Sequence, residues 1–203
     1  MKFLFSPPSL DDIIRLLKAW KYWIFGALLG ALIGAAVYFI APPLYRARAT
    51  VLVDFNLEEA LPNDTDRHHF YYLERETRKL EEIAWSDDLM SSLSFDYGIS
   101  VEELRGGMLE LSQPAEGGWH FFANVSDSKL AGQLASAWAA GFTSEVQQRI
   151  DSGNLNSFIQ VEVTQSVDLP AERSEPVSTY LLIGAIAFLA ISALGMLFFD
   201  KPK

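Results

Sequence analysis

Residues 22–40 read YWIFGALLGALIGAAVYFI, and residues 42–53 continue as PPLYRARATVLV. The first run carries no charge and is long enough to cross a bilayer core of about 30 Å at roughly 1.5 Å rise per residue. Pro42 and Pro43 cannot continue its helix. The alternating, β-branched segment that follows is typical of a strand. The stretch therefore predicts a membrane helix that leads directly into the first strand of an extracytoplasmic domain.

A second charge-free run, from Val177 to Phe199, lies just before the end of the chain and is also long enough to span. The two runs predict a hairpin of membrane helices that holds a domain between them. The expected division is a cytoplasmic amphipathic lead-in, a first span, an extracytoplasmic α+β domain, a second span and a cytoplasmic tail, over residues 1–21, 22–41, 43–176, 177–199 and 200–203.

The charges indicate an orientation. Lys and Arg outweigh the acids in both flanks, whereas the middle of the chain is acidic and accounts for the net charge of −10 among 203 residues. Basic flanks stay on the cytoplasmic side, so both termini are predicted to be cytoplasmic. The acidic middle argues against nucleic acid as a partner, and without cysteine there is no disulfide or thiolate site. The alternative of a cleaved signal peptide fits less well, because the apolar run exceeds the usual core of about 7–15 residues.

Residues 9–21 predict an amphipathic helix before the first span, with Ser9 as its cap. Its apolar face and the aromatic residues Trp20, Tyr22 and Trp23 suit the inner headgroup layer, so membrane lipid is an expected partner.

Small residues repeat every four positions in the first span. The row is Gly26, Gly30 and Gly34, with Ala27 and Ala31 beside it. Such rows let another helix approach closely. The expected partner is either the second span or a neighbouring subunit.

The middle of the chain predicts a strand, a helix over 67–85, two short helices that begin at the caps Ser86 and Ser100 and end at Gly98 and Gly106, a hairpin over 108–125, a helix from Ser126 or Asp127 to Ile150, and a strand over 158–167. The helix to Ile150 carries an apolar stripe that predicts a core face: Ala131, Leu134, Ala135, Trp138, Phe142 and Val146. This order is the β-α-β-β-α-β arrangement of a ferredoxin-like sheet with helices on one face. In that arrangement we expect the first and last strands to lie side by side in the middle of the sheet, each leading to a span.

The sequence shows no pattern of an active site: no catalytic, cofactor-binding or metal-binding residues are predicted. A phosphate-binding glycine loop is absent. His68 and His69 are adjacent, which does not suit a shared metal on a helix, and His120 has no obvious partner. Trp119, Trp138 and the aromatic cluster over residues 70–72 are candidates for a sugar site, although burial in the core is their more common fate.

The chain resembles the Wzz-type chain length determinants, or polysaccharide co-polymerases, of bacterial inner membranes. The resemblance rests on the lead-in over 12–21, on Pro43, Tyr45, Arg46 and Ala47 after the first span, and on Pro170 and Pro176 before the second. A further similarity opens the long helix at residues 128–135. Family members extend this helix into a coiled-coil arm, whereas here only residues 151–156 separate it from the last strand.

The resemblance implies a non-enzymatic, ring-forming scaffold that needs no cofactor and sets the length of a surface glycan beside a membrane polymerase. Two other classes stay open. One is an accessory adaptor of an exporter or ligase complex, and the other is a membrane-anchored sensor of a small ligand or sugar.

Overall fold

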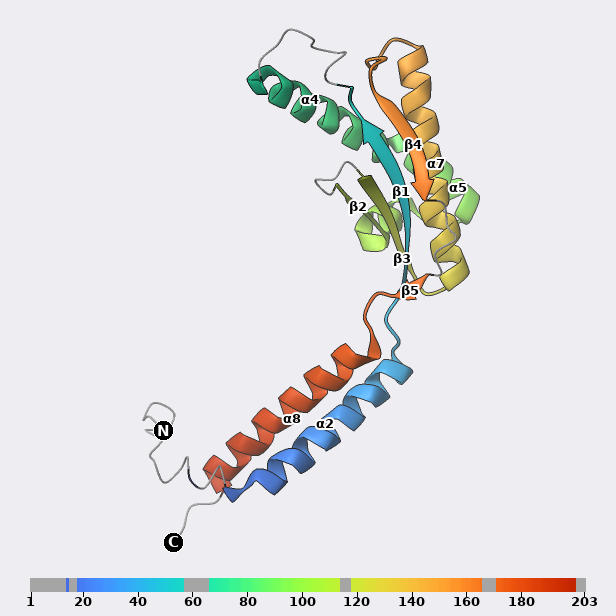
Figure 1. The fold of residues 1–203 in the computed structure, drawn as a ribbon. Helices are drawn as coiled ribbons and strands as arrows, with labels where there is room; N and C mark the ends of the chain where they lie inside the picture. The colour runs from blue at the N-terminus through green and yellow to red at the C-terminus, as the bar shows by residue number, and fades with distance from the viewer. Residues whose placement is uncertain (1–13, 15–17, 57–65, 114–117, 166–170, 200–203) are drawn as a thin grey trace. The chain divides into compact units, whose positions relative to one another are not determined.

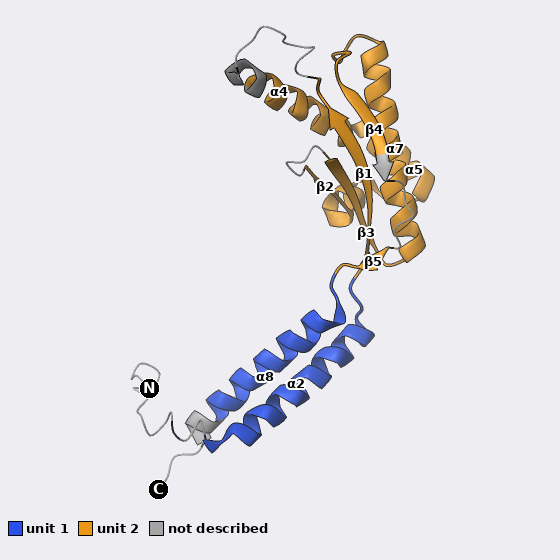
Figure 2. Ribbon diagram, viewed as in Figure 1, with its two compact units in different colours: residues 1–43, 175–203 blue, residues 44–174 orange. Residues whose placement is uncertain are grey.

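The computed structural model of the chain describes residues 14, 18–56, 66–113, 118–165 and 171–199. The chain divides into two compact units, one of residues 1–43 with 175–203 and one of residues 44–174 (Figure 2). The first unit contains two apolar helices and the second an antiparallel sheet with helices. Most of the amphipathic helix predicted over residues 9–21 lies outside the described residues.

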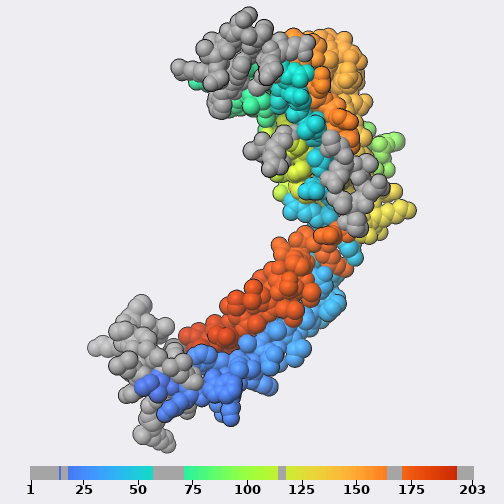
Figure 3. All heavy atoms as spheres, viewed as in Figure 1, coloured from blue at the N-terminus to red at the C-terminus, as the bar shows by residue number. Residues whose placement is uncertain are grey.

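The helices of the first unit are α2 (Trp20–Ile40) and α8 (Val177–Phe199). They run antiparallel, side by side (Figure 1), and the space-filling view shows them in contact along their length (Figure 3). By length and composition both are able to cross a membrane. Helix α2 ends where Pro42 and Pro43 follow, because neither proline has a backbone N–H to continue the helix.

The sheet of the second unit has β1 at its centre. Along the sheet the order is β2-β3-β1-β4, every pairing is antiparallel, and a short fifth strand pairs with the beginning of β1. The strands are β1 (Tyr45–Asp54), β2 (Leu109–Ser112), β3 (Gly118–Val125), β4 (Gln160–Gln165) and β5 (Glu172–Arg173).

The last strands differ from the sequence prediction. The first and last long strands do pair, Val53 with Val161, but β4 occupies the edge of the sheet rather than its middle. It begins at Gln160 rather than at residue 158, and residues 166 and 167 of the predicted strand lie outside the described residues. The connection to α8 instead passes through β5, whose Arg173 pairs with Tyr45. The pattern could not indicate β5, because two residues are too few to show an alternation.

Among the described residues, five helical segments complete the second unit, and three of them begin at predicted capping residues. Ser86 accepts a hydrogen bond from the Leu89 N–H, Ser100 forms a capping box with Glu103, and Asp127 accepts from Lys129 and Leu130. The segments are α4 (Asp66–Ala84), α5 (Asp87–Tyr97), α6 (Val101–Glu103), the π-helical turn η1 (Leu104–Met108) and α7 (Ser128–Asp151).

The core lies between α7 and one face of the sheet. The predicted apolar stripe of α7 is fully buried, Trp138 and Phe142 included, and it packs against β1 and β3. Trp138 also donates a hydrogen bond of 2.8 Å from its indole N–H to the Ala84 carbonyl, which joins α4 to α7. On β1 the alternate residues Arg46, Thr50 and Leu52 point away from this core. We call the face that they occupy the outer sheet face.

Candidate functional site

The glycines of α2 lie against α8. Gly26, Gly30 and Gly34 are buried. A Cβ atom added at Gly30 would fall on the carbonyl oxygen of Gly184, and one added at Gly34 would fall on that of Tyr180. The two backbones therefore approach each other more closely than side chains would permit, as small residues allow in helix pairs.

The sequence reveals the glycine row of α2 but not the residue of α8 against which Gly30 lies. Gly184 is the partner of Gly30 and is missed by a search for repeats, because it is not part of a four-residue row. Gly195, the other glycine of α8, does not take part in the close approach, because a Cβ added there would meet nothing within 4 Å. Ala27 and Ala31 are half-buried beside the glycine row.

The segment after the first span forms the beginning of β1. Tyr45 pairs with Val125 of β3 and with Arg173 of β5, and the Arg173 guanidinium lies 4.5 Å from the centre of the Tyr45 ring. Ala47 is buried in the core. Pro43 directly precedes this strand region and Pro176 directly precedes α8, whereas Pro170 lies outside the described residues.

Arg46 belongs to the outer sheet face. It donates to the Glu110 carboxylate at 2.8 Å, and its guanidinium lies 4.0 Å from the centre of the Phe122 ring. An ion pair and a cation–π contact together hold this side chain flat on the sheet. The arginine that follows the first span is thus a structural element of the sheet.

His120 also lies on the outer sheet face. Its Nδ1 and the Thr50 hydroxyl form a hydrogen bond of 3.1 Å. Burial, and to a smaller extent the positive charge of Arg48, lower the pKa of His120 from its ordinary value of 6.5. The imidazole is therefore held neutral to lower pH than a free histidine.

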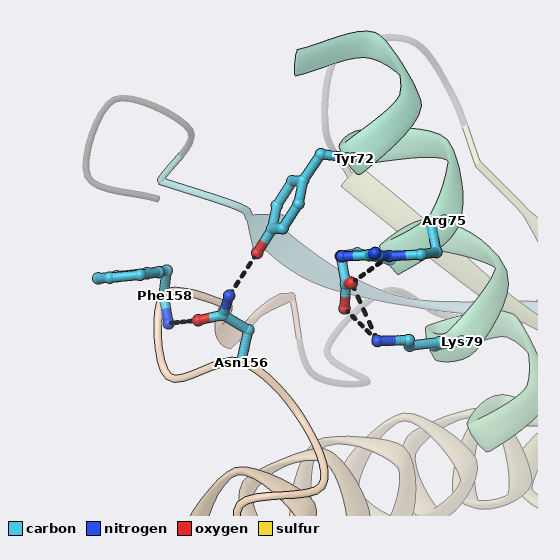
Figure 4. Close-up of polar contacts among 6 residues, drawn as sticks. Tyr72, Arg75, Lys79, Asn156 and Phe158 are labelled. Carbon is cyan, nitrogen blue, oxygen red and sulfur yellow. Dashed lines mark hydrogen bonds and ion pairs between the residues drawn. The ribbon is translucent and has the colours of Figure 1, made fainter. Parts of the chain in front are cut away.

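A polar cluster joins α4 to the connection between α7 and β4 (Figure 4). Asn156 donates to the Tyr72 hydroxyl oxygen at 2.8 Å, and its side-chain oxygen accepts from the Phe158 N–H at 3.1 Å. Burial first, and then the Glu76 carboxylate, raise the pKa of Tyr72 above 10.0. The neutral hydroxyl is thereby favoured in this contact.

Glu76 is the buried charged residue of the cluster, at 1% exposure. Arg75 donates to its carboxylate through Nε at 3.0 Å, and Lys79 donates through Nζ at 3.0 and 3.1 Å. A buried carboxylate is costly unless it is paired. Here the pairing holds two cations in place at the surface of α4.

Those two cations border a shallow, open hollow on α4 with a volume of about 440 Å³. Among the described residues it is lined by Tyr71, Glu74, Arg75, Arg78, Lys79 and Glu82. Tyr71 is 54% exposed, whereas the candidates Trp119 and Trp138 are buried in the core. Within the described part of the chain, no three His, Asp or Glu residues are grouped as a metal site would require.

Residues 9–84 match the Wzz family model, which is described as chain length determinant protein. Over these residues the chain is similar to the Wzz family. The match includes α2, β1 and α4, so the resemblance seen in residues 43–47 is confirmed over this part of the chain. The Wzz family has a role in determining polysaccharide chain length, and its members are regulators rather than enzymes. No curated protein matches the chain.

Proposed function

We propose that this Wzz-type chain is a non-enzymatic scaffold of the bacterial inner membrane that regulates the chain length, assembly or export of a surface polysaccharide. The glycan would be a lipopolysaccharide O-antigen, a capsule or an exopolysaccharide. The observation that carries the proposal is the Wzz match itself, because it extends from the first apolar helix through β1. Since β1 is paired on both sides, the matched segment forms the centre of the folded domain.

The proposed topology places both termini in the cytoplasm and the domain in the periplasm, as a multi-pass protein. Two observations support it. Both apolar helices are long enough to span, and both chain ends of the domain, at Leu44 and Ser174, lead directly to them. The Ser174 N–H also donates to the Leu44 carbonyl at 2.9 Å, which holds these two ends together. For the domain we propose a ferredoxin-like β-α-β-β-α-β fold, which the order β2-β3-β1-β4 supports.

We further propose that the scaffold assembles as a ring of identical subunits beside a membrane polysaccharide polymerase or export machinery. The glycine row packs against α8 of the same chain, so the contacts between subunits are proposed at other surfaces. The edge strand β4 supports that edge of the sheet as one such surface, because its apolar Val163 is 37% exposed.

The short connection between α7 and β4 bears on how length would be controlled. Leu155 and Ile159 are buried in the core, and Asn156 contacts Tyr72. The connection is therefore packed against the domain at the place where relatives extend a coiled-coil arm. We propose that this chain regulates through its membrane-proximal base alone.

Deleting the gene and separating the surface glycan on a gel tests this function against the two alternatives. An altered distribution of chain lengths supports the length regulator. Loss of surface glycan with normal lengths in the remaining material supports an export or ligase adaptor instead. An unchanged glycan supports a membrane-anchored sensor and contradicts the proposal.

A further inference from the structure

The hollow on α4 carries an inference that chain length regulation does not require. Its lining combines three kinds of side chain: the cations Arg75, Arg78 and Lys79, the carboxylates of Glu74 and Glu82, and the exposed ring of Tyr71. The hydrogen bonds and exposure of these side chains decide which class of ligand the hollow suits.

Arg75 is fixed but not fully used. It donates to the buried Glu76 through Nε, the nitrogen nearest the aliphatic stem, and its side chain is 65% exposed. The guanidinium also lies 5.5 Å from the centre of the Tyr72 ring. No hydrogen bond joins its two terminal nitrogens to another residue in the described part of the chain. They therefore form a pre-oriented pair of donors of the geometry that recognises a carboxylate or phosphate.

Lys79 is held by the same buried acid. Both Glu76 oxygens accept from its ammonium group, which remains 42% exposed at the side-chain level. Arg78 is engaged differently, because it pairs with Glu74 at 2.6 Å on the exposed surface. The fixed positive charge of the hollow thus comes from Arg75 and Lys79, because both side chains donate hydrogen bonds to the buried carboxylate of Glu76.

The carboxylates narrow the choice of ligand. Glu82 and Glu74 accept hydrogen bonds and repel a dense negative charge, so a phosphate ion alone suits the lining poorly. A molecule with one carboxylate and several hydroxyl groups offers an acceptor to Arg75 and donors to the glutamates. The apolar face of a sugar ring also fits against an aromatic side chain such as Tyr71.

We propose that the α4 hollow binds a polyhydroxylated carboxylate, with Arg75 as the principal contact to the carboxylate. Either a uronic acid residue within a glycan or a free sugar acid would supply this chemistry.

Calorimetric titration of the full chain in detergent micelles tests the proposal. The probes are a galacturonic acid trimer, free glucuronate, the neutral sugar maltotriose and inorganic phosphate. We expect the trimer to bind and maltotriose and phosphate to bind at least about tenfold more weakly. Glucuronate that binds as well as the trimer identifies a free sugar acid as a sufficient ligand, whereas binding of the trimer alone identifies a glycan segment. Both results support the site.

Two matched variants locate the binding. Arg75→Gln removes the pair of donors from the hollow and should weaken binding of the trimer about tenfold or more, since charged hydrogen bonds are the strong ones. Arg149→Gln on α7 makes the same substitution at an arginine that also donates through Nε to a glutamate, Glu145, far along the sequence from the hollow, and should leave binding unchanged. Tyr71→Leu provides a second variant of the lining, with a smaller loss expected.

The proposal is overturned if Arg75→Gln and Arg149→Gln weaken binding of the trimer equally, because binding would then depend on the overall charge of the chain and not on the hollow. Equal binding of phosphate and the trimer, or no binding of either sugar acid, also overturns it. Since the readout is direct binding, a failure here leaves the glycan-length test untouched, and a normal glycan length in a deletion strain leaves the site untouched.

Discussion

Gly30 of α2 and Gly184 of α8 lie backbone against backbone: a Cβ added to either residue would fall on the carbonyl oxygen of the other. This reciprocal contact makes the two apolar helices a paired unit within one chain. Within this chain the glycines of α2 lie against α8, which is one of the two partners that the sequence leaves open.

Gly30→Ala is therefore expected to weaken the pairing of the two helices by about 1–3 kcal/mol, the usual cost of adding a methyl group to a packed contact. The measurement is the distance between spin labels on cysteines introduced at Phe39 and Leu182, both exposed. Since the chain has no native cysteine, the labels are specific. The distance distribution should broaden.

Gly195→Ala is the matched control, because an added Cβ at Gly195 meets nothing within 4 Å. It changes the same residue type in the same way on α8 and should leave the distance distribution narrow. A narrow distribution in Gly30→Ala as well would contradict the close contact.

Trp138→Phe is expected to destabilise the domain. Trp138 is fully buried, and its indole N–H is the donor to the Ala84 carbonyl at 2.8 Å. Phenylalanine leaves that carbonyl without its donor and leaves part of the indole volume empty, which should cost about 1–3 kcal/mol. Denaturant unfolding of the full chain in detergent, followed by circular dichroism, measures the loss.

Phe95→Ala serves as its control. Phe95 is 89% exposed, so its truncation should change the free energy of unfolding by no more than about 0.5 kcal/mol. A Trp138→Phe variant as stable as this control would show that the α4–α7 contact contributes little.

His120 is expected to make the stability of the domain depend on pH. Burial and Arg48 lower its pKa in the folded state below 6.5. The unfolded chain therefore binds the proton first as the pH falls, and the free energy of unfolding decreases below about pH 6.5. Above that pH the residue is neutral in both states and contributes no slope.

The test compares denaturation midpoints of the wild type and His120→Gln at about pH 5 and about pH 7.5. The wild type should lose more stability between these values than the variant. Equal losses would mean that other groups account for the whole pH dependence.

Local patterns predict much of this fold. The stripe of α7 repeats at helical spacing from Ala131 to Val146 and is buried as expected. The capping side chains of Ser86 and Ser100 each accept a hydrogen bond from the backbone N–H three residues later. Such features are encoded by neighbours along the chain, so a single sequence reveals them.

The features that the sequence does not reveal depend on distant residues. Tyr72 and Asn156 are 84 positions apart, and no local sequence pattern indicates that they are in contact. The same holds for Gly30 and Gly184. The edge position of β4 depends on which strand covers the rest of β1, and β5 is too short to be recognised. The sequence likewise does not reveal the hollow on α4, because it does not show that Glu76 is the buried acid among the glutamates of this helix.

The central proposal is that this chain sets the length of a surface glycan through a base domain without a coiled-coil arm. The most direct measurement is the modal glycan length, on a gel, in a deletion strain that carries either the wild-type gene or Gly30→Leu at equal protein level. The account predicts that the wild type restores a defined modal length and that Gly30→Leu leaves the distribution of the deletion strain. An identical distribution with and without the wild-type gene would contradict it.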